Sequence, residues 1–352
     1  MSYTNKVIHS GYFNETLREW QCQNTQITPI NLMYPIFILD EKDVREDIKS
    51  MPGIYRQGLN HVKAMLDPVV ESGLKSILIF GVINKLPKDQ CGTHADSPEN
   101  PVIQALPLLK KWYPNLVIAC DVCLCPYSSD GHCGIVENQQ IDNIRSINRI
   151  GEIALSYALA GADIVAPSCM MDGHVTAIKQ SLMKENLLSR VSVLSYSAKF
   201  CSVFYGPFRD AANCAPSFSN RSSYQIPVGS SSIAERVVER DISESCDMTM
   251  VKPGMMYLDI VRKVKDKHPN IPIFIYQVNP FFHFIQDIVI MFILLKVSGE
   301  YAMLYYAVQA GVIQLKEGLL EILRSMRRAG GDVIVTYYTP EILKWLKDVP
   351  IL

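Results

Sequence analysis

The sequence has no apolar run long enough to cross a lipid bilayer. The apolar stretch that comes nearest, IVIMFILL at 288–295, has eight residues without a charge, whereas a membrane-spanning helix needs roughly 20. The first 21 residues contain no apolar core of the kind that a secretory signal requires. Neither sign of charge is in excess, because the formal net charge is −1. We therefore expect a cytosolic protein that binds neither membranes nor nucleic acids.

The sequence also lacks the cysteine spacing of a small disulfide-linked domain, although it contains ten cysteines. Without a secretory signal, these thiols are expected to stay reduced. Four of them nevertheless lie close together in the stretch CDVCLCPYSSDGHCG at 120–134. A cluster of reduced cysteines in a cytosolic protein is more often metal-binding or catalytic than cross-linked.

No G-x-G-x-x-G sequence follows the first predicted strand, which argues against a dinucleotide-binding open sheet. Short apolar runs alternate instead with longer stretches of helical periodicity. Eight runs are predicted as strands, at 34–39, 76–81, 116–122, 163–168, 191–197, 248–253, 271–277 and 332–337. Their near-continuous apolar character is typical of strands buried on both faces of a parallel sheet. The alternation predicts an α/β fold, a (β/α)8 or TIM barrel, with a doubly wound open sheet as the alternative.

Helices are expected between these strands, and three show clear apolar periodicity, at 144–163, 174–190 and 318–332. Gly161 lies near the end of the first, and glycine commonly ends a helix. Residues 1–27 precede the first strand and cannot bury themselves. We interpret them as an extended N-terminal arm that packs on another subunit, and residues 28–352 as the catalytic barrel.

The carboxyl ends of the predicted strands carry polar residues. Catalytic residues of (β/α)8 barrels lie at that end, which here contains Gly81, Asp121, Ser168, Lys199, Lys252, Gln277 and Tyr337. A lysine amine attacks a ketone only when it is unprotonated, and free lysine has a pKa of about 10.4. Two lysines on neighbouring strands would lower each other's pKa and favour a Schiff base. A solvated surface lysine is the alternative for each.

The cysteine cluster follows the third strand, at the same end of the barrel. Cys123, Cys125 and Cys133 form a C-x-C-x7-C pattern in a loop rich in Pro, Ser and Gly. Zinc prefers thiolate ligands in a tetrahedron, and three cysteines leave a fourth position for water or substrate. We predict a catalytic Zn2+ there. The alternative is that the cysteines are small buried apolar residues, which is our interpretation of Cys120.

Residues 206–229 form a long segment without periodicity, and loops of that length are usually functional or disordered. The segment contains Arg209 and Arg221, and guanidinium groups suit carboxylates. We predict a lid that closes over an anionic substrate. Two solvated arginines are the alternative.

Five stretches together resemble the porphobilinogen synthase family, whose members are also called 5-aminolevulinate dehydratases. They are ACDVCLCPYSSDGHCG, VSVLSYSAKFCSVFYGPFRDAA, MTMVKPGMMYLDIVRKVKDKHP, VSGEYAML and TYYTPEILKWLK. The resemblance extends from about Ile30 to the C-terminus with one gap. It implies a hydro-lyase that condenses two molecules of 5-aminolevulinate into the pyrrole porphobilinogen and releases two waters, in haem and other tetrapyrrole biosynthesis. It also implies an allosteric homo-octamer in which each arm embraces a neighbouring barrel.

The resemblance assigns roles to individual residues. It implies that Lys252 forms a Schiff base with the first substrate and Lys199 one with the second. One zinc ion per subunit, on the three clustered cysteines, would bind or polarise the second substrate. The residues expected to hold the carboxylates are Ser298 and Tyr337 for the first substrate, and Arg209 and Arg221 for the second. Those otherwise expected to contact substrate or move protons are Asp121, Ser168, Tyr205, Phe208 and Gln225.

The sequence departs from the family pattern after the fourth strand. The family usually has A-P-S-D-M-M-D-G-R where this chain has APSCMMDGH, so Cys169 and His174 replace an acid and an arginine. We expect the loss of both charges to weaken contacts near the site or at a subunit interface. Some members hold a second zinc with the histidine of G-H-C-G and a later cysteine. Ser223 stands at that later position, which leaves His132 a weak metal candidate.

The gap in the resemblance is an insert. In the family the seventh strand runs directly into Y-x-V-S-G-E, whereas here 19 residues, 278–296, separate Gln277 from Val297. Val278 and Val297 are interchangeable in this comparison, so the edges can shift by one residue. The apolar composition argues against an exposed loop, and we interpret the insert as a retained intron or a splice variant. A real surface loop is the alternative.

Two other functions remain open at this point. One is a Schiff-base aldolase-type lyase on the same barrel, which would need no metal. The other is an inactive splice-variant subunit of the same family that still joins or disturbs the oligomer.

Overall fold

The structure is a computed structural model of the chain, and it describes residues 14–22, 25–48, 51–205, 211–277 and 300–348. The insert at 278–296 and most of the N-terminal arm lie outside the described residues. So do three of the predicted site residues, Phe208, Arg209 and Ser298.

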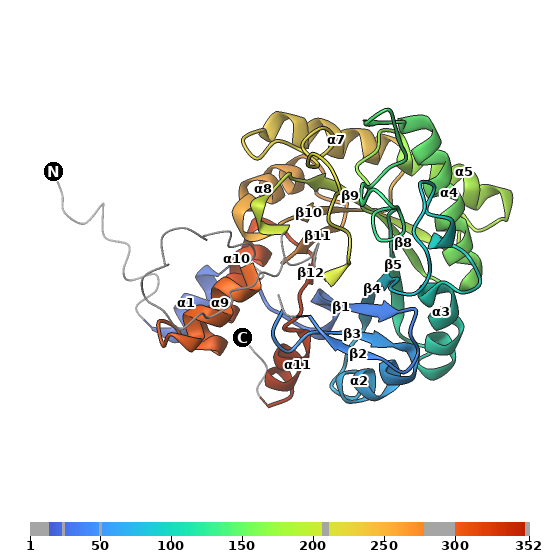
Figure 1. Cartoon of the computed structure of the whole chain (residues 1–352). Helices are drawn as coiled ribbons and strands as arrows, with labels where there is room; N and C mark the ends of the chain where they lie inside the picture. The colour runs from blue at the N-terminus through green and yellow to red at the C-terminus, as the bar shows by residue number, and fades with distance from the viewer. Residues whose placement is uncertain (1–13, 23–24, 49–50, 206–210, 278–299, 349–352) are drawn as a thin grey trace, which may run out of the picture.

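Eight parallel strands close into a barrel (Figure 1). In chain order they are β1 (Leu32–Leu39), β4 (Ser76–Val82), β5 (Val117–Val122), β8 (Ile164–Pro167), β9 (Ser192–Lys199), β10 (Met248–Lys252), β11 (Ile273–Tyr276) and β12 (Val333–Val335). The last strand pairs with the first, through Leu32 with Ile334 and Met33 with Val335. This closure confirms the (β/α)8 barrel and excludes the doubly wound open sheet. Each of the eight predicted strands is present.

Helices surround the barrel on its outside (Figure 1). They are α2 (Leu59–Glu71), α3 (Pro101–Trp112), α4 (Asn143–Ala160), α5 (His174–Lys184), α7 (Ser231–Ser243), α8 (Leu258–Lys267), α9 (Glu300–Gln309), α10 (Leu315–Ala329) and α11 (Thr339–Asp348). The three helices predicted from periodicity are α4, α5 and α10. The Asp142 side chain caps the start of α4, and Gly161, with a φ of 114°, ends it. None of the described helices is both long and apolar enough to cross a membrane.

The loops contain short strands and 3-10 helices. A two-stranded hairpin of β2 (Arg45–Asp47) and β3 (Tyr55–Gly58) extends the sheet beside the end of β1. A second pair, β6 (Val136–Glu137) and β7 (Gln140–Ile141), follows the cysteine loop. The 3-10 helices are η3 (Pro29–Asn31), η4 (Thr93–Ala95), η5 (Val203–Tyr205) and η6 (Met255–Tyr257).

The core explains why the strands could be recognised from composition. All eight residues of β1 and all four residues of both β8 and β11 are buried. One face of each strand packs inside the barrel and the other packs on the helices, so both faces must be apolar. Cys120 is buried within β5 as a small apolar residue.

Strand β9 contains one irregularity that shapes the interior. Its residues Leu194 and Ser195 pair with Met248 and Thr249, but the next pair is Ala198 with Val251, so β9 has one extra residue there. Side chains alternate between the two faces of a regular strand, and residues 196 and 199 would then point to opposite sides. The extra residue restores Lys199 to the inner face, where its amine lies 5.7 Å from the centre of the Tyr196 ring.

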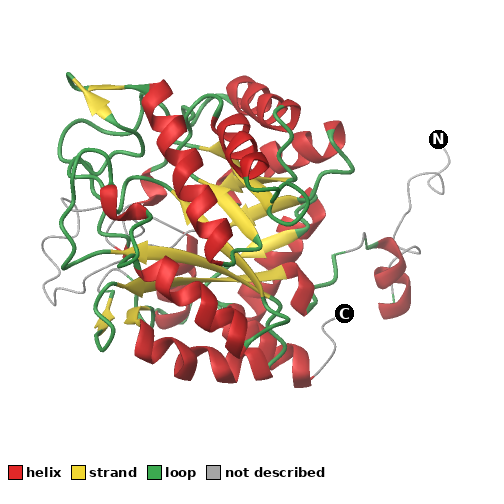
Figure 2. Ribbon diagram, turned by 90° about the vertical axis from the view of Figure 1, so that its right-hand side faces the viewer, coloured by secondary structure: helices red, strands yellow, loops and turns green. Residues whose placement is uncertain are grey.

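The described part of the N-terminal arm contains a short helix, α1 (Glu15–Gln21). Figure 2 shows this helix set apart from the barrel. Ile27, by contrast, is buried in the core of the barrel.

Candidate active site

Two lysines end neighbouring strands of the barrel. Lys199 is the last residue of β9 and Lys252 the last of β10, and the two are paired in register across the parallel ladder. Both are buried, with 3% and 1% of their surface exposed. The Lys252 amine lies 3.8 Å from the centre of the Tyr276 ring. The structure thus brings the two predicted amines together at the C-terminal end of the barrel.

Aromatic rings surround the Lys252 amine. The rings of Tyr196, Tyr205 and Phe80 have centres 5.3, 5.6 and 5.8 Å from it. Burial in this environment, followed by the positive charge of Lys199, holds the pKa of Lys252 well below its ordinary value. A lowered pKa leaves the amine unprotonated near neutrality, which is the form that attacks a carbonyl carbon.

Lys199 differs in its charge state. Burial lowers its pKa, but the negative charges of Cys133 and Cys123 outweigh burial and hold that pKa above the ordinary value. Its amine donates a 2.5 Å hydrogen bond to the carbonyl oxygen of Ser168. The prediction that each lysine lowers the pKa of the other is therefore correct for Lys252 and wrong for Lys199, because the thiols lie beside Lys199.

Asp121 lies in β5 close to both lysines. Burial raises the pKa of its carboxyl group to about 6, although the positive charges of Lys199 and Lys252 and the Ser168 hydroxyl act in the other direction. Its Oδ1 atom has no hydrogen-bond partner in the described part of the chain. A carboxyl group that exchanges a proton near neutrality and has one oxygen free is suited to proton transfer.

Two tyrosines complete this end of the barrel. The Tyr205 hydroxyl donates a 2.7 Å hydrogen bond to the carbonyl oxygen of Lys252. The hydroxyl groups of Tyr337 and Tyr276 are 3.0 Å apart, and the Tyr337 ring stacks on that of Phe37. Both tyrosines are therefore held beside the residues that surround Lys252.

The structure also brings the three clustered cysteines together. The Sγ atoms of Cys123, Cys125 and Cys133 all lie within 4.8 Å of one another, and those of Cys123 and Cys125 are 3.3 Å apart. All three residues are buried. Zn–S bonds of roughly 2.3 Å in a tetrahedron place the sulfur atoms about 3.8 Å apart. The number, chemistry and spacing of these donors therefore fit one zinc ion.

The charges around the thiols favour binding of a cation. Hydrogen bonds from the thiols of Cys123 and Cys125 hold the pKa of Cys133 well below its ordinary value, and Arg221 adds to this effect. Burial raises the pKa of Cys123, and the neighbouring thiols raise that of Cys125. Because a metal binds the thiolate form, these two thiols would lose their protons on binding.

His132 lies outside this thiol group. Its Nδ1 atom is 3.0 Å from the Tyr224 hydroxyl, and its Nε2 atom is 3.1 Å from the carbonyl oxygen of Phe218. Both ring nitrogens are thus used to join the cysteine loop to residues 211–224. The geometry gives no support to the weak prediction that His132 binds a metal.

The predicted lid segment contributes two buried residues, Arg221 and Gln225, to the site. Arg221 has 2% of its surface exposed, and its Nη2 atom donates hydrogen bonds of 2.9 and 2.6 Å to the carbonyl oxygens of Gly131 and Cys214. Gln225 is also buried, and neither atom of its side-chain amide has a hydrogen-bond partner within the described residues. A buried amide without partners is expected where a polar ligand binds.

The sequence was then compared with known families. The model of the delta-aminolevulinic acid dehydratase family matches residues 6–291 and 285–345, which together span most of the chain. The chain belongs to this family. The two matched stretches meet inside the range 278–296 that we interpret as an insert.

Individual relatives agree with the delta-aminolevulinic acid dehydratase assignment. The enzyme of that name from Pongo abelii is 52% identical over 343 residues, which cover 97% of this chain and 98% of the relative. The one from Schizosaccharomyces pombe is 46% identical over 342 residues, with 97% and 98% covered. The crystal structure of the Toxoplasma gondii ME49 enzyme, in complex with its reaction product porphobilinogen, matches with a TM-score of 0.88 at 36% identity, covering 97% of this chain and 92% of that one.

This assignment decides between the functions left open by the sequence. The chain is a hydro-lyase of the delta-aminolevulinic acid dehydratase, or porphobilinogen synthase, type. An aldolase-type lyase is excluded, and the comparisons do not favour an inactive subunit.

Two residues of the site were not predicted. Cys214 is buried in the lid segment, and the neighbouring thiol of Cys125 lowers its pKa to about 6. Tyr196 is buried inside the barrel, and its hydroxyl has no hydrogen-bond partner in the described ranges. No local pattern points to Cys214, because it comes near the cluster only when the lid segment folds over it. In the sequence, nothing distinguishes Tyr196 from the other residues of an apolar strand.

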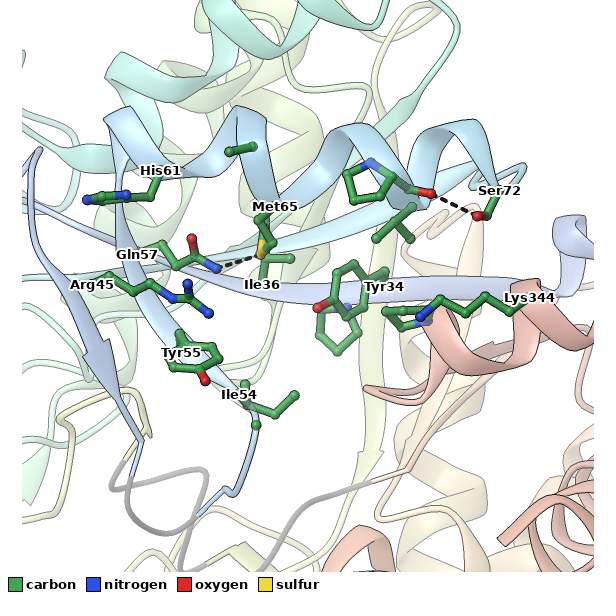
Figure 3. Close-up of a pocket in the computed structure, with 16 residues that line it drawn as sticks. Tyr34, Ile36, Arg45, Ile54, Tyr55, Gln57, His61, Met65, Ser72 and Lys344 are labelled. Atoms are coloured by element: carbon green, nitrogen blue, oxygen red, sulfur yellow. Dashed lines mark hydrogen bonds between the residues drawn. The ribbon is translucent and has the colours of Figure 1, made fainter.

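A separate cavity of about 400 Å3 lies on the outside of the barrel, between α2, α11 and the β2–β3 hairpin (Figure 3). Tyr34, Tyr55 and Lys344 are among the residues that line it. Among the described residues, none of the predicted site residues lines this cavity.

Proposed function

We propose that this enzyme makes porphobilinogen through two Schiff bases, one on Lys252 and one on Lys199. The single observation that carries the proposal is the pairing of these two buried lysines in register at the ends of β9 and β10. In each case the amine nitrogen would attack the ketone carbon of one 5-aminolevulinate, and the ketone oxygen would leave as water. The lowered pKa of Lys252 prepares this amine for the first attack.

The carboxylates of the two substrates would bind on different sides of the lysines. Tyr337, next to Tyr276, and Ser298 would hold the first. Arg221 would hold the second, since its guanidinium already lies buried above the thiols. On substrate binding, the hydrogen bonds that Arg221 donates to backbone carbonyl oxygens would be replaced by bonds to the substrate carboxylate. The new bonds would be stronger because they are charge-assisted. The residues assigned with Arg221 to the second substrate are Arg209, Phe208 and Gln225.

Asp121, Ser168 and Tyr205 would move protons and fix the lysines. Asp121 is suited to take and return a proton because its pKa lies at about 6. The carbonyl oxygen of Ser168 holds the Lys199 amine, and Tyr205 holds the backbone of Lys252. The Lys199 amine and the Lys252 backbone would thus each be held in place by a hydrogen bond.

We assign one catalytic zinc ion per subunit to Cys123, Cys125 and Cys133. Such an ion would supply Lewis acidity toward the second substrate and would orient its amine. The same thiols raise the pKa of Lys199, so its amine lies beside the group that would hold the ion. Lys199 would therefore form the second Schiff base next to that ion.

The experiment that tests this function uses the purified full chain with 5-aminolevulinate as the only substrate. Pyrrole formation is measured after removal of metal with a chelator, and again after addition of zinc. We expect activity that disappears with the chelator and returns with zinc. Full activity of the metal-free protein would contradict the role of zinc, and no pyrrole under any condition would contradict the activity itself.

Assembly and location follow from the same proposal. Residues 1–27 would contact a neighbouring subunit in a homo-octamer with allosteric behaviour, since α1 is set apart from its own barrel (Figure 2). The ten cysteines are free in the structure, which suits the reducing cytosol. Neither a nucleic acid nor a membrane is expected as a partner. Residues 278–296 would be an insert that weakens binding of the first substrate.

A further inference from the structure

His174 takes part in a buried chain of polar contacts on the outer side of β9. Its Nδ1 atom is 2.5 Å from the carbonyl oxygen of Met171, and its Nε2 atom is 3.0 Å from the Ser195 hydroxyl oxygen. The same hydroxyl oxygen is 2.6 Å from Oδ2 of Asp241 in α7. His174, Ser195 and Asp241 are all almost fully buried, so solvent does not complete these contacts.

The three contacts can be used to count protons. Each of them requires one hydrogen atom between its two heavy atoms. A carbonyl oxygen carries none, so the hydrogen in the first contact is on Nδ1 of His174. The Ser195 hydroxyl has a single hydrogen, which can serve the contact with His174 or the contact with Asp241 but not both. One of these two contacts therefore needs a further proton, on the imidazole or on the carboxylate.

Arg240 decides where that further proton lies. Its Nε and Nη2 atoms donate hydrogen bonds of 3.0 and 2.8 Å to Oδ1 of Asp241. A guanidinium ion paired through two bonds with a carboxylate favours the ionised carboxylate. With Asp241 ionised, the Ser195 hydroxyl donates to Asp241, and Nε2 of His174 must donate to Ser195.

We infer that His174 is held in this protein as an imidazolium ion, protonated on both ring nitrogens, and acts as a positioning residue for the turn between β8 and α5. The inference goes beyond the proposed function, which gives His174 no role. It also differs from the expectation from sequence that the replacement of arginine at this position removes a positive charge. An imidazolium ion keeps the positive charge of the arginine, but unlike arginine it can lose that charge by giving up a proton.

The turn that His174 holds, residues 168–173, needs such support. Met170 has a φ of 64°, in the left-handed region that a side chain other than glycine seldom adopts. Met171, the next residue, provides the carbonyl oxygen that His174 binds. At the start of the same turn, the carbonyl oxygen of Ser168 accepts a hydrogen bond from the Lys199 amine. Fixing Met171 thus helps to fix a contact of the catalytic lysine.

Charged groups on each neighbouring element agree with a cation at His174. Arg240 in α7 forms ion pairs with Asp172 of the turn and with Glu244 of α7, besides that with Asp241. His174 opens α5, where the helix dipole disfavours a positive charge, but Asp241 lies 3.9 Å from Nε2 and opposes this effect. Of the charged groups in this network, Asp241 faces His174 directly, and Arg240, Asp172 and Glu244 are joined to Asp241 through ion pairs.

The direct test measures the protons on the ring. The full-length protein is labelled with 15N histidine, sedimented and examined at pH 7.5 by magic-angle-spinning NMR. The two signals of His174 among the seven histidines are those that disappear in His174→Arg, or in His174→Gln if the arginine variant is insoluble. We expect both nitrogens to give signals of protonated imidazolium. One protonated and one unprotonated nitrogen would overturn the inference.

A second test uses stability and pH. Loss of a ring proton at high pH would break the contact that Nε2 of His174 donates to Ser195, so stability should fall as the pH rises. We expect the unfolding temperature of the natural sequence to drop by several degrees between pH 6 and 8.5, relative to His174→Arg, which keeps its charge. His174→Gln should be the least stable of the three at pH 6. Equal pH dependence of the natural and arginine forms would contradict the inference.

Discussion

Lys199 and Lys252 occupy the same level of two neighbouring strands, yet their amines have different charge states. Lys252 is surrounded by aromatic rings and has a lowered pKa, whereas Lys199 lies beside the thiols and has a raised one. In the proposed mechanism Lys252 would therefore react first, because its amine loses a proton more readily than that of Lys199.

The first prediction concerns this order. Borohydride reduces an imine to a stable amine, so treatment in the presence of 5-aminolevulinate should trap an adduct on Lys252. Lys199→Ala should still be trapped on Lys252 but should form no pyrrole, because the second Schiff base is missing. Peptide mapping by mass spectrometry identifies the labelled residue. Label found only on Lys199 or elsewhere would show that the order is wrong.

The second prediction concerns the thiols. Cys125→Ala should abolish tight zinc binding and lower activity at least a hundredfold, because it removes one of three thiolates. Cys91→Ala is the matched control, since Cys91 is a half-buried free cysteine that is not in the cluster. Zinc content is measured with activity on the same samples. A zinc-free Cys125→Ala protein with the activity of the control would eliminate the metal role.

The fold could be predicted from the sequence because each barrel strand is apolar on both faces and is separated from the next by a periodic helix. The cysteine cluster could also be predicted, since its three members are close in the chain. The extra residue in β9, which turns Lys199 inward, leaves no pattern in the sequence.

Properties that depend on tertiary neighbours could not be predicted. The charge of Lys199 is set by thiols on another loop, and the position of Cys214 by the way the lid segment folds. The same reason applies to His174. Sequence comparison shows that an arginine is replaced there, but only the contacts with Ser195 and Asp241 indicate that the histidine keeps a positive charge.

The third prediction concerns Asp121. Because its pKa is raised to about 6 in the folded state, compared with about 3.9 in the unfolded chain, the folded state binds more protons between these values. The resulting loss of stability grows as the pH rises through this window and is complete above pH 6 or so. Asp121→Asn should therefore stabilise the protein at pH 7.5, by up to about 3 kcal/mol, while pyrrole formation falls.

Chemical denaturation at pH 7.5 and at pH 4 measures the free energy of unfolding of the natural protein and of Asp121→Asn. Pyrrole formation is measured on the same samples, because stability should rise while activity falls. The gain in stability should shrink at pH 4, where Asp121 is protonated in the folded protein. Asp130→Asn serves as a control, because Asp130 lies in the cysteine loop outside the site and is only half-buried. A variant that loses stability at pH 7.5 would show that the charge of Asp121 supports the fold instead of opposing it.

The last prediction concerns residues 278–296. Ser298 must stand just beyond the end of β11 for its hydroxyl to reach the first substrate's carboxylate, yet the 19 residues 278–296 lie between Gln277 and Val297, the residue before Ser298. Fully extended, they would displace Ser298 by tens of ångströms, at roughly 3.3 Å per residue. If the ends of the insert meet, loop closure costs only about 3 kcal/mol, and Ser298 can return to its place. The run IVIMFILL would still favour aggregation.

Deletion of 278–296 should therefore raise the soluble yield and lower the KM for 5-aminolevulinate. Both forms are expressed side by side, and soluble protein and pyrrole formation are measured at several substrate concentrations. A third form, in which Ile288, Ile290 and Leu294 are replaced with Ser, separates the two effects. It should recover solubility without recovering substrate affinity, because the length of the insert is unchanged. If the full-length protein equals the deletion in yield and KM, the insert is a tolerated loop, and its interpretation as a splicing product loses its physical support.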